Sequence, residues 1–341
     1  MQKAQVNPMF KTRNYRVFEV PLEFHLKHSP QQRPKLRLFR DGWLVAYWLL
    51  VVPSLVMSVF LLVGNNPSLV SPTLGLVLLI GALHLAGALL CVWALPIYRG
   101  TPKRLAALAV LWGGAASVVL AAVVIQPPVV STVDKLGWHG LTASFGGAYP
   151  EEIAKGLGIW LLLWMGRAWW NRPWHGLIAG LLVGLGFEVF ENMMYAMMLA
   201  VMDPVSDIQG ALSTYFLRMI AGPAKHMMFS ALVGYGIGLA MFVGAKAGKP
   251  RGVAWRLGAV VLWGGLGFLT HFAWNVRWLD VSPVFQLLWM GLVWVVLAAL
   301  TVGAIVWTSV EFLRWKKRGI CPAVTVYQRC LLYTSPSPRD S

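Results

Sequence analysis

The chain has 341 residues, of which 57% are hydrophobic and 12% are charged, with a formal net charge of +16. Soluble domains carry about twice that share of charged residues, so the composition excludes a set of soluble domains and indicates a polytopic membrane protein. The positive charge lies in short segments between apolar runs, as the positive-inside rule describes, and does not indicate nucleic-acid binding. Three cysteines have neither disulfide-framework nor metal-ligand spacing: Cys91, Cys321 and Cys330.

The first part of the chain, residues 1–41, is basic and contains proline. We expect it to be cytoplasmic, and it shows no pattern of a cleavable signal peptide. Apolar runs of membrane-spanning length follow it. They predict an all-α bundle of about eight transmembrane helices, near residues 43–64, 73–97, 105–126, 147–166, 175–200, 217–243, 254–276 and 284–308.

The loops between these runs alternate between basic and non-basic sequences. The basic ones read "YRGTPKR", "GRAWWNR" and "KAGKPRGVAWR", and "RWKKR" follows the last run, whereas the other loops are neutral, acidic or mixed. A missed or additional helix would break this alternation, so it supports the count of eight. By the positive-inside rule, both termini are then cytoplasmic.

The predicted helices divide the chain beyond residue 41 into four further parts. Three transmembrane helices occupy residues 42–140, and a four-helix core with the candidate site occupies 141–278. The last transmembrane helix and a basic cytoplasmic end occupy 279–318. The tail, 319–341, ends in "LLYTSPSPRDS", which resembles a translated sequencing adapter, and we expect it to be partly non-native.

Ionisable residues occur within the four helices of this core. Such residues are costly in a bilayer and are by default candidates for a functional site. Counting about 1.5 Å per residue from the predicted helix ends places them at one level, in the outer third of the bilayer. They are Glu151 and Glu152 in the first helix, Glu191 in the second, His226 in the third, and His271 with Asn275 in the fourth.

Carboxylates and imidazoles at one depth suit hydrolytic chemistry. One Glu and two His can form a zinc-like ligand set with an open position, and a second Glu can act as a base on water. Each residue also has a structural interpretation, such as a helical ion pair of Lys155 with Glu151 or Glu152. Asn192 can likewise be a structural residue that forms a hydrogen bond between helices. Arg218 lies at a helix end, where it can snorkel or bind a substrate carboxyl group. Glu188 has no evident partner.

Four motifs in order, "EEIAK", "GFEVFEN..Y", "R......KHMMFSALVGYGIG" and "HFAWN", cover roughly residues 145–276. They resemble those of PrsW-like intramembrane proteases, which belong to the superfamily of the CAAX prenyl endopeptidases. The resemblance implies an integral membrane peptidase of the bacterial cytoplasmic membrane. Its substrate would be a membrane-embedded or membrane-proximal protein, such as an anti-sigma-factor-like regulator. By motif, the catalytic positions are Glu151, Glu152, Glu191, His226, His271 and Asn275, with Lys155, Asn192 and Arg218 in support.

The resemblance leaves two mechanisms open. In a metal-assisted mechanism, His226, His271 and Glu191 hold zinc or another divalent metal. In a metal-free mechanism, Glu151 or Glu152 activates water, and His and Asn groups stabilise the oxyanion. Two functions of other classes remain as alternatives: a non-catalytic scaffold that binds transmembrane segments, and a proton-coupled transporter, for which intramembrane Glu and His are equally apt. The sequence does not indicate an oligomeric state.

Overall fold

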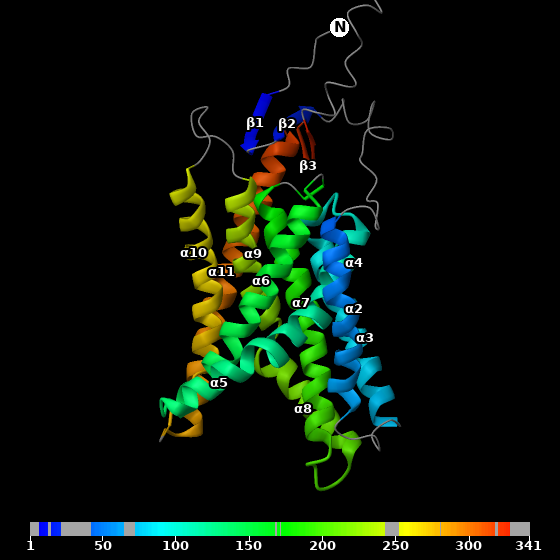
Figure 1. Cartoon of the computed structure of the whole chain (residues 1–341), viewed down its shortest axis with the longest axis vertical. Helices are drawn as coiled ribbons and strands as arrows, with labels where there is room; N and C mark the ends of the chain where they lie inside the picture. The colour runs from blue at the N-terminus through cyan, green and yellow to red at the C-terminus, as the bar shows by residue number, and fades with distance from the viewer. Residues whose placement is uncertain are drawn as a thin grey trace, which may run out of the picture.

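The computed structural model describes residues 7–12, 15–21, 42–64, 72–167, 169–170, 172–242, 252–279, 281–317 and 320–327. Most of them lie in a body of long helices (Figure 1). Apolar runs become helices here because a helix satisfies its own backbone hydrogen bonds where no water is present. In chain order the helices are α2 (Gly42–Val63), α3 (Pro72–Ala94), α4 (Lys103–Leu111), α5 (Gln126–Lys135), α6 (Tyr149–Met165), α7 (Pro173–Ala200), α8 (Asp207–Ala221), α9 (Lys225–Phe242), α10 (Val253–Asn275) and α11 (Pro283–Lys317).

Short helical turns complete the connections between these helices. Two π-helical turns, Trp112–Ser117 and Leu120–Ile125, lie between α4 and α5, and a third, Ser144–Ala148, leads into α6. Two 3₁₀ turns occupy Pro96–Tyr98 and His139–Leu141.

Within the described residues, six helical segments are long and apolar enough to cross a membrane. This finding confirms a polytopic all-α architecture. The segments are Gly42–Val63, Pro72–Ala94, Lys103–Lys135, Pro173–Ala200, Val253–Asn275 and Pro283–Arg314. The predicted spans 147–166 and 217–243 are not among them, and the first of these is the 17-residue helix α6. The count of eight crossings therefore stays a prediction.

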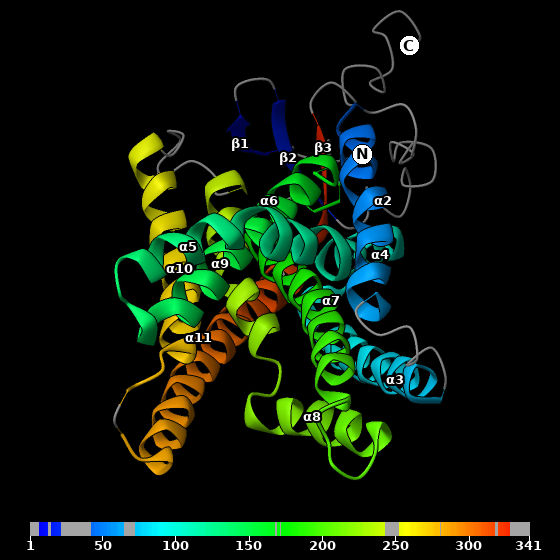
Figure 2. The ribbon, with the colours of Figure 1, turned by 60° about the horizontal axis from the view of Figure 1, so that its bottom comes forward.

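The predicted continuous helix over 217–243 is wrong, because the chain breaks into α8 and α9. Helix α8 ends at Ala221 and α9 begins at Lys225. Between them Pro223 has no backbone N–H to donate, and Ala224 takes a positive φ of 55°. Helix α8 consequently runs across the end of the body that lies away from the strands (Figure 2).

Helix α7 lies at the centre of the body, and its residues from Trp174 to Asn192 are all buried. Three of its glycines face the backbone of α9. A Cβ atom added at Gly176, Gly180 or Gly184 would lie 2.0–2.3 Å from a carbonyl oxygen of α9. Only glycine permits so close a contact, so the row of three glycines allows the backbones of α7 and α9 to pack directly against each other.

Three short strands, which the sequence did not predict, lie at one end of the helical body (Figure 1). They are β1 (Asn7–Thr12), β2 (Tyr15–Pro21) and β3 (Ile320–Tyr327), and they form an antiparallel sheet in that order. The sheet pairs a segment that precedes α2 with one that follows α11. Strand β3 falls within the tail predicted to be partly non-native, and residues 328–341 lie outside the described part of the chain.

The two ends of the body differ in charge. Helix α2 begins and α11 ends on the side of the strands (Figure 1). Two basic segments connect α3 with α4 and α6 with α7, and their described residues (98–104, 166–167, 169–170 and 172) lie at this same end. This arrangement agrees with the predicted alternation of loops. Which end faces the cytoplasm stays a prediction.

Candidate functional site

Helices α6, α7, α9 and α10 bring their ionisable side chains together inside the body. Depth counting on the sequence predicted a common level for Glu151, Glu152, Glu191, His226 and His271, and the structure brings these side chains into contact with one another and with Lys155 and Glu188. Nearly all of them are buried, although they are polar or charged. The members of this polar cluster are Glu151, Glu152, Lys155, Glu188, Glu191, His226 and His271.

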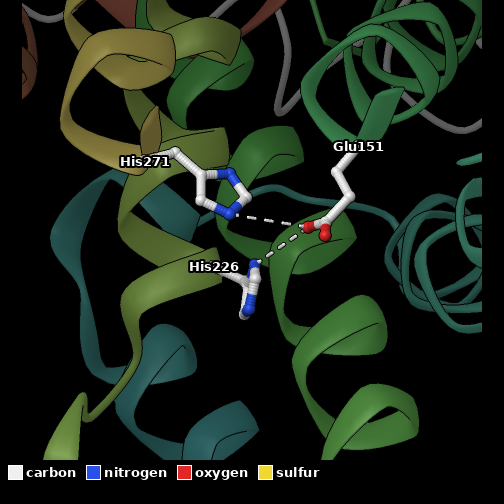
Figure 3. Close-up of side chains that lie close together, drawn as sticks. All are labelled: Glu151, His226 and His271. Carbon is white, nitrogen blue, oxygen red and sulfur yellow. Dashed lines mark ion pairs between the residues drawn. The ribbon is translucent and has the colours of Figure 1, made fainter. Parts of the chain in front are cut away.

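Glu151 reaches from α6 toward two histidines on different helices (Figure 3). Its Oε2 atom lies 3.6 Å from Nδ1 of His226 and 3.7 Å from Nε2 of His271. The two imidazole rings are nearly perpendicular, at 83°, with centroids 5.2 Å apart. One carboxylate oxygen and two ring nitrogens therefore surround a single point, all within 4.8 Å of one another.

Lys155 connects three members of the polar cluster. Its Nζ atom donates hydrogen bonds to Glu151 Oε2 at 3.0 Å and to Glu152 Oε1 at 3.0 Å. The same atom lies 3.1 Å from Nδ1 of His226 and 3.8 Å from the centre of the Phe187 ring. The helical ion pairs expected from the sequence are therefore present, and they lie inside the cluster.

Each histidine has a second carboxylate on its other ring nitrogen. Glu152 Oε1 lies 2.9 Å from Nδ1 of His271, and Glu191 Oε2 lies 2.9 Å from Nε2 of His226. A carboxylate in this position fixes the tautomer and the orientation of an imidazole ring. Because the ammonium group of Lys155 only donates, Nδ1 of His226 accepts. The lone pair on Nδ1 of His226 therefore accepts from Lys155, whereas that on Nε2 of His271 faces Glu151 Oε2 at 3.7 Å.

Arg218 comes from α8 and pairs with Glu191 through Nη2. Its Nε donates a hydrogen bond to Oδ1 of Asn192 at 2.8 Å, and its guanidinium group lies 4.0 Å from the centre of the Tyr195 ring. The sequence left Arg218 either to snorkel or to bind a substrate carboxyl group. In the structure Arg218 instead forms an ion pair with Glu191.

Glu188 is 1% exposed, and its partner is the backbone of α9. Its Oε2 atom accepts hydrogen bonds from the backbone N–H groups of His226, at 3.1 Å, and Met227, at 3.4 Å. The first N–H groups of a helix have no partner within that helix and carry partial positive charge. Glu188 therefore caps α9 from α7 and fixes the residue that carries the His226 side chain. The "GPA" before Lys225 marks a helix start at that point, and was the signal that sequence analysis missed.

A cavity of about 810 Å³ adjoins the polar cluster and extends to the loop between α10 and α11. Six of the predicted site residues line it: Glu151, Glu191, Arg218, His226, His271 and Asn275. Asn275 stands at the wall, with its Nδ2 donating to the backbone oxygen of Ala143 at 3.2 Å. Glu152, Lys155 and Asn192 lie behind the wall and do not line the cavity.

The three donor atoms are grouped closely enough to hold a divalent metal ion, which would displace the Lys155 ammonium group from Glu151 Oε2 and His226 Nδ1. One carboxylate and two imidazoles form a ligand set that is common for zinc, and tetrahedral ligands at about 2.1 Å from an ion are about 3.4 Å apart. The observed separations of 3.6 and 3.7 Å are close to that value. The grouped carboxylate is that of Glu151, whereas Glu191, expected from the sequence as a ligand, contacts the opposite nitrogen of His226.

A family model described as "PrsW family intramembrane metalloprotease" matches residues 101–310, which is more than half of the chain. The chain belongs to this family. No match was found among curated proteins or among solved structures. This PrsW-family protein is thus an integral membrane protein and an intramembrane peptidase.

The matched region of this PrsW-family protease runs from just before α4 to near the end of α11. It contains every member of the polar cluster, whereas α2 and α3 lie outside it. The description as a metalloprotease agrees with the grouping of Glu151, His226 and His271 around one point.

Proposed function

We propose that this protease hydrolyses a peptide bond of a membrane-embedded or membrane-proximal protein at the cavity wall formed by α6, α7, α9 and α10. The observation that carries the proposal is the convergence of Glu151, His226 and His271 from three helices. An anti-sigma-factor-like regulator is the class of substrate that the resemblance to PrsW-like proteases suggests. Membership of a protease family favours this function over a scaffold or a transporter.

We further propose that Glu151, His226 and His271 hold zinc or another divalent metal. This set replaces the one with Glu191 that the sequence suggested, because Glu151 Oε2 lies 3.6 and 3.7 Å from ring nitrogens of both histidines. At Nδ1 of His226 the metal would take the place of the hydrogen bond from Lys155. When bound at such a site, a divalent metal polarises a carbonyl group and makes water more acidic.

In the metal-free mechanism, Glu151 is the proposed general base. Of the two adjacent glutamates of α6, only Glu151 lines the cavity. Its Oε2 faces the histidines, and its Oε1 lies 3.5 Å from the position of a Cβ atom on Gly147, another residue of the cavity wall. A water in the cavity can therefore give its proton to this carboxylate. Glu152 positions His271 from behind the cavity wall, whereas Glu191, which lines the cavity, contacts Nε2 of His226.

Asn275 is the proposed donor to the oxyanion. Hydrolysis of a peptide bond places negative charge on the carbonyl oxygen, and a fixed N–H group directed at that oxygen lowers the barrier. One Nδ2 hydrogen of Asn275 binds the backbone of Ala143, which holds the amide in place. Its second Nδ2 hydrogen is then available at the cavity wall.

The position of the cavity suits a site near one surface of the bilayer. Its lining includes the loop between α10 and α11, at the end of the body opposite the strands. We propose that this end faces outward, that α6 and α9 complete eight crossings, and that both chain termini are cytoplasmic. The positive-inside rule supports this orientation, since the basic segments lie at the other end.

The function is tested in vesicles that contain the full chain and synthetic single-span peptides. We expect the wild type to cleave such a peptide at a defined bond near the outer surface, as identified by mass spectrometry. The Glu151→Gln/Glu152→Gln double variant should not cleave it. Equal cleavage by both proteins would contradict the proposal. Peptide binding without any cleavage by the wild type would instead favour the scaffold alternative.

A further inference from the structure

The cavity wall contains more cationic than anionic side chains, and its acids are already paired. Glu151 bonds to Lys155 at 3.0 Å, and Glu191 pairs with Arg218. Lys225 and Arg277 line the same cavity. Within the part of the chain that the structure describes, neither of these two side chains makes a hydrogen bond or an ion pair. Among the described residues, the wall therefore has two cations without a direct hydrogen bond or ion pair, the buried Lys225 and the exposed Arg277, and no unpaired acid.

Lys225 is the more unusual of the two, because it is 6% exposed. It is the first residue of α9 and immediately precedes His226. Its Cδ atom lies 3.0 Å from where a Cβ atom on Gly222 would stand, so the glycine leaves room for the lysine stem. The carboxylates of Glu191 and Glu188 attract its ammonium group, but neither forms a hydrogen bond or ion pair with it. A buried ammonium group without a direct contact is costly, and a side chain placed in this way is suited to a partner that enters the cavity.

We infer that Lys225, assisted by Arg277, binds a carboxylate of the protein substrate. The inference rests on the proposed proteolytic function and adds a substrate class to it. The carboxylate is either an Asp or Glu side chain close to the cleaved bond or a free C-terminal carboxylate. A peptide carboxylate is favoured because Lys225 lies on the cavity wall next to a residue of the site, where the substrate chain must pass.

The spacing of residues limits where the substrate carboxylate lies. Consecutive Cα atoms are about 3.8 Å apart, and an extended peptide spans about 3.3–3.6 Å per residue. Since Lys225 and His226 are adjacent and both line the cavity, we expect a carboxylate on Lys225 to belong to a residue within a few positions of the cleaved bond. Arg218 does not take this role, because it is paired with Glu191.

The probe is a set of single-span peptides with one apolar segment, in vesicles of phosphatidylcholine. Members carry Asp at one position near the outer boundary, or Asn at that position, each with a free or an amidated C-terminus. We expect the wild type to show a KM roughly tenfold lower for the Asp peptide than for its Asn counterpart. The Lys225→Met variant should lose this difference, and Lys225→Arg should keep it. A Lys135→Met variant, which removes an exposed charge outside the cavity, should behave as the wild type.

Two comparisons distinguish an Asp side chain from the C-terminal carboxylate as the ligand, and failure of this inference from failure of the proposed protease function. If amidation of the C-terminus, rather than Asp→Asn, raises KM, the C-terminal carboxylate is the ligand. Cleavage of Asp and Asn peptides with equal KM, free and amidated alike, overturns the inference and leaves the protease function intact. A preference that requires anionic lipid in the vesicles also overturns it.

Binding measured without turnover tests the site even if no peptide is cleaved. Fluorescence anisotropy with labelled peptides and the Glu151→Gln variant should give about a tenfold tighter Kd for the Asp peptide than for the Asn peptide. Adding Lys225→Met should abolish that difference. Equal Kd values of the Asp and Asn peptides for the Glu151→Gln variant would contradict the inference. This result does not depend on whether the Lys225 variants fold, because Lys225 is intact in Glu151→Gln. Absence of cleavage by the wild type with preserved selective binding would contradict only the proposed function.

Discussion

Helices α6 and α7 each carry two glutamates in the polar cluster, and within each pair the two have different surroundings. Glu151 and Glu191 line the cavity, with side chains 13% and 12% exposed. Glu152 and Glu188 lie behind it, and each holds one histidine: Glu152 through the ring of His271, and Glu188 through the backbone of His226. The comparison teaches that an intramembrane acid can serve either as a reacting group or as a positioning group, depending on which side of the histidines it occupies.

The strongest test of this difference between the glutamates is to neutralise the adjacent pair on α6 one residue at a time. We expect Glu151→Gln to lower the cleavage rate roughly a thousandfold, because it removes the proposed base. Initial rates on a single-span peptide in vesicles measure the effect. Glu311→Gln, a change on α11 away from the cavity, is the matched control. A Glu151→Gln variant that retains more than half of the activity would exclude Glu151 as the base.

Removing one histidine tests whether the cluster holds a metal. We expect His226→Ala and His271→Ala each to lose stoichiometric zinc or another divalent metal, measured by mass spectrometry of the purified protein, together with activity. The His84→Ala variant, changed on α3, should keep its metal. Incubation with a chelator should abolish wild-type cleavage, and added zinc should restore it. Full activity in demonstrably metal-free protein would favour the glutamate-only mechanism.

The buried member of the α6 pair should have a smaller effect than Glu151. We expect Glu152→Gln to lower the cleavage rate roughly 10- to 100-fold, the usual effect of losing a carboxylate that orients a metal-binding histidine. Metal affinity should fall together with the rate, because the tautomer and orientation of His271 are less well fixed. Titration with a metal indicator measures this. A rate loss equal to that of Glu151→Gln would remove the distinction between the two residues.

The smallest effect is expected at Glu188. In Glu188→Gln the amide oxygen can still accept a hydrogen bond from α9, so we expect less than about a tenfold loss of rate. Glu188→Leu leaves the N–H groups of His226 and Met227 without their partner and should lower the free energy of unfolding by about 1–3 kcal/mol. Thermal unfolding in detergent micelles compares the two variants. Equal stability of the Leu variant and the wild type would show that Glu188 does not fix α9.

The sequence predicted the membrane architecture and the residues of the cluster because those depend on composition and on counting along helices. Apolar runs give the spans, and a rise of about 1.5 Å per residue gives the depth of Glu191 or His226. Depth counting says nothing about which ring nitrogen a carboxylate meets. For that reason the sequence predicts Glu191 as a ligand, whereas the structure groups Glu151 with both histidines.

The break between α8 and α9 was predictable in part. The apolar character of residues 217–243 continues across it, and this continuity favoured a single helix. The "AGPAK" within this run is nevertheless a turn signal, since proline after glycine interrupts a helical pattern. The direction of α8 after the break depends on its contacts with α3 and α7, such as the bond between His84 and Tyr215, which no local signal encodes.

The break also decides which residues can share one carboxylate. In a continuous helix, Arg218 and His226 would lie about 12 Å apart along the axis, since they are eight residues apart. The reversal at Gly222–Ala224 instead brings both side chains to the same oxygen, Oε2 of Glu191. A substitution that restores helical continuity, such as Pro223→Ala, would draw the guanidinium group and the imidazole toward different depths of the bilayer. The bend thus shortens the distance between the two residues along the chain axis, so that a guanidinium group and a neutral imidazole meet at one carboxylate oxygen.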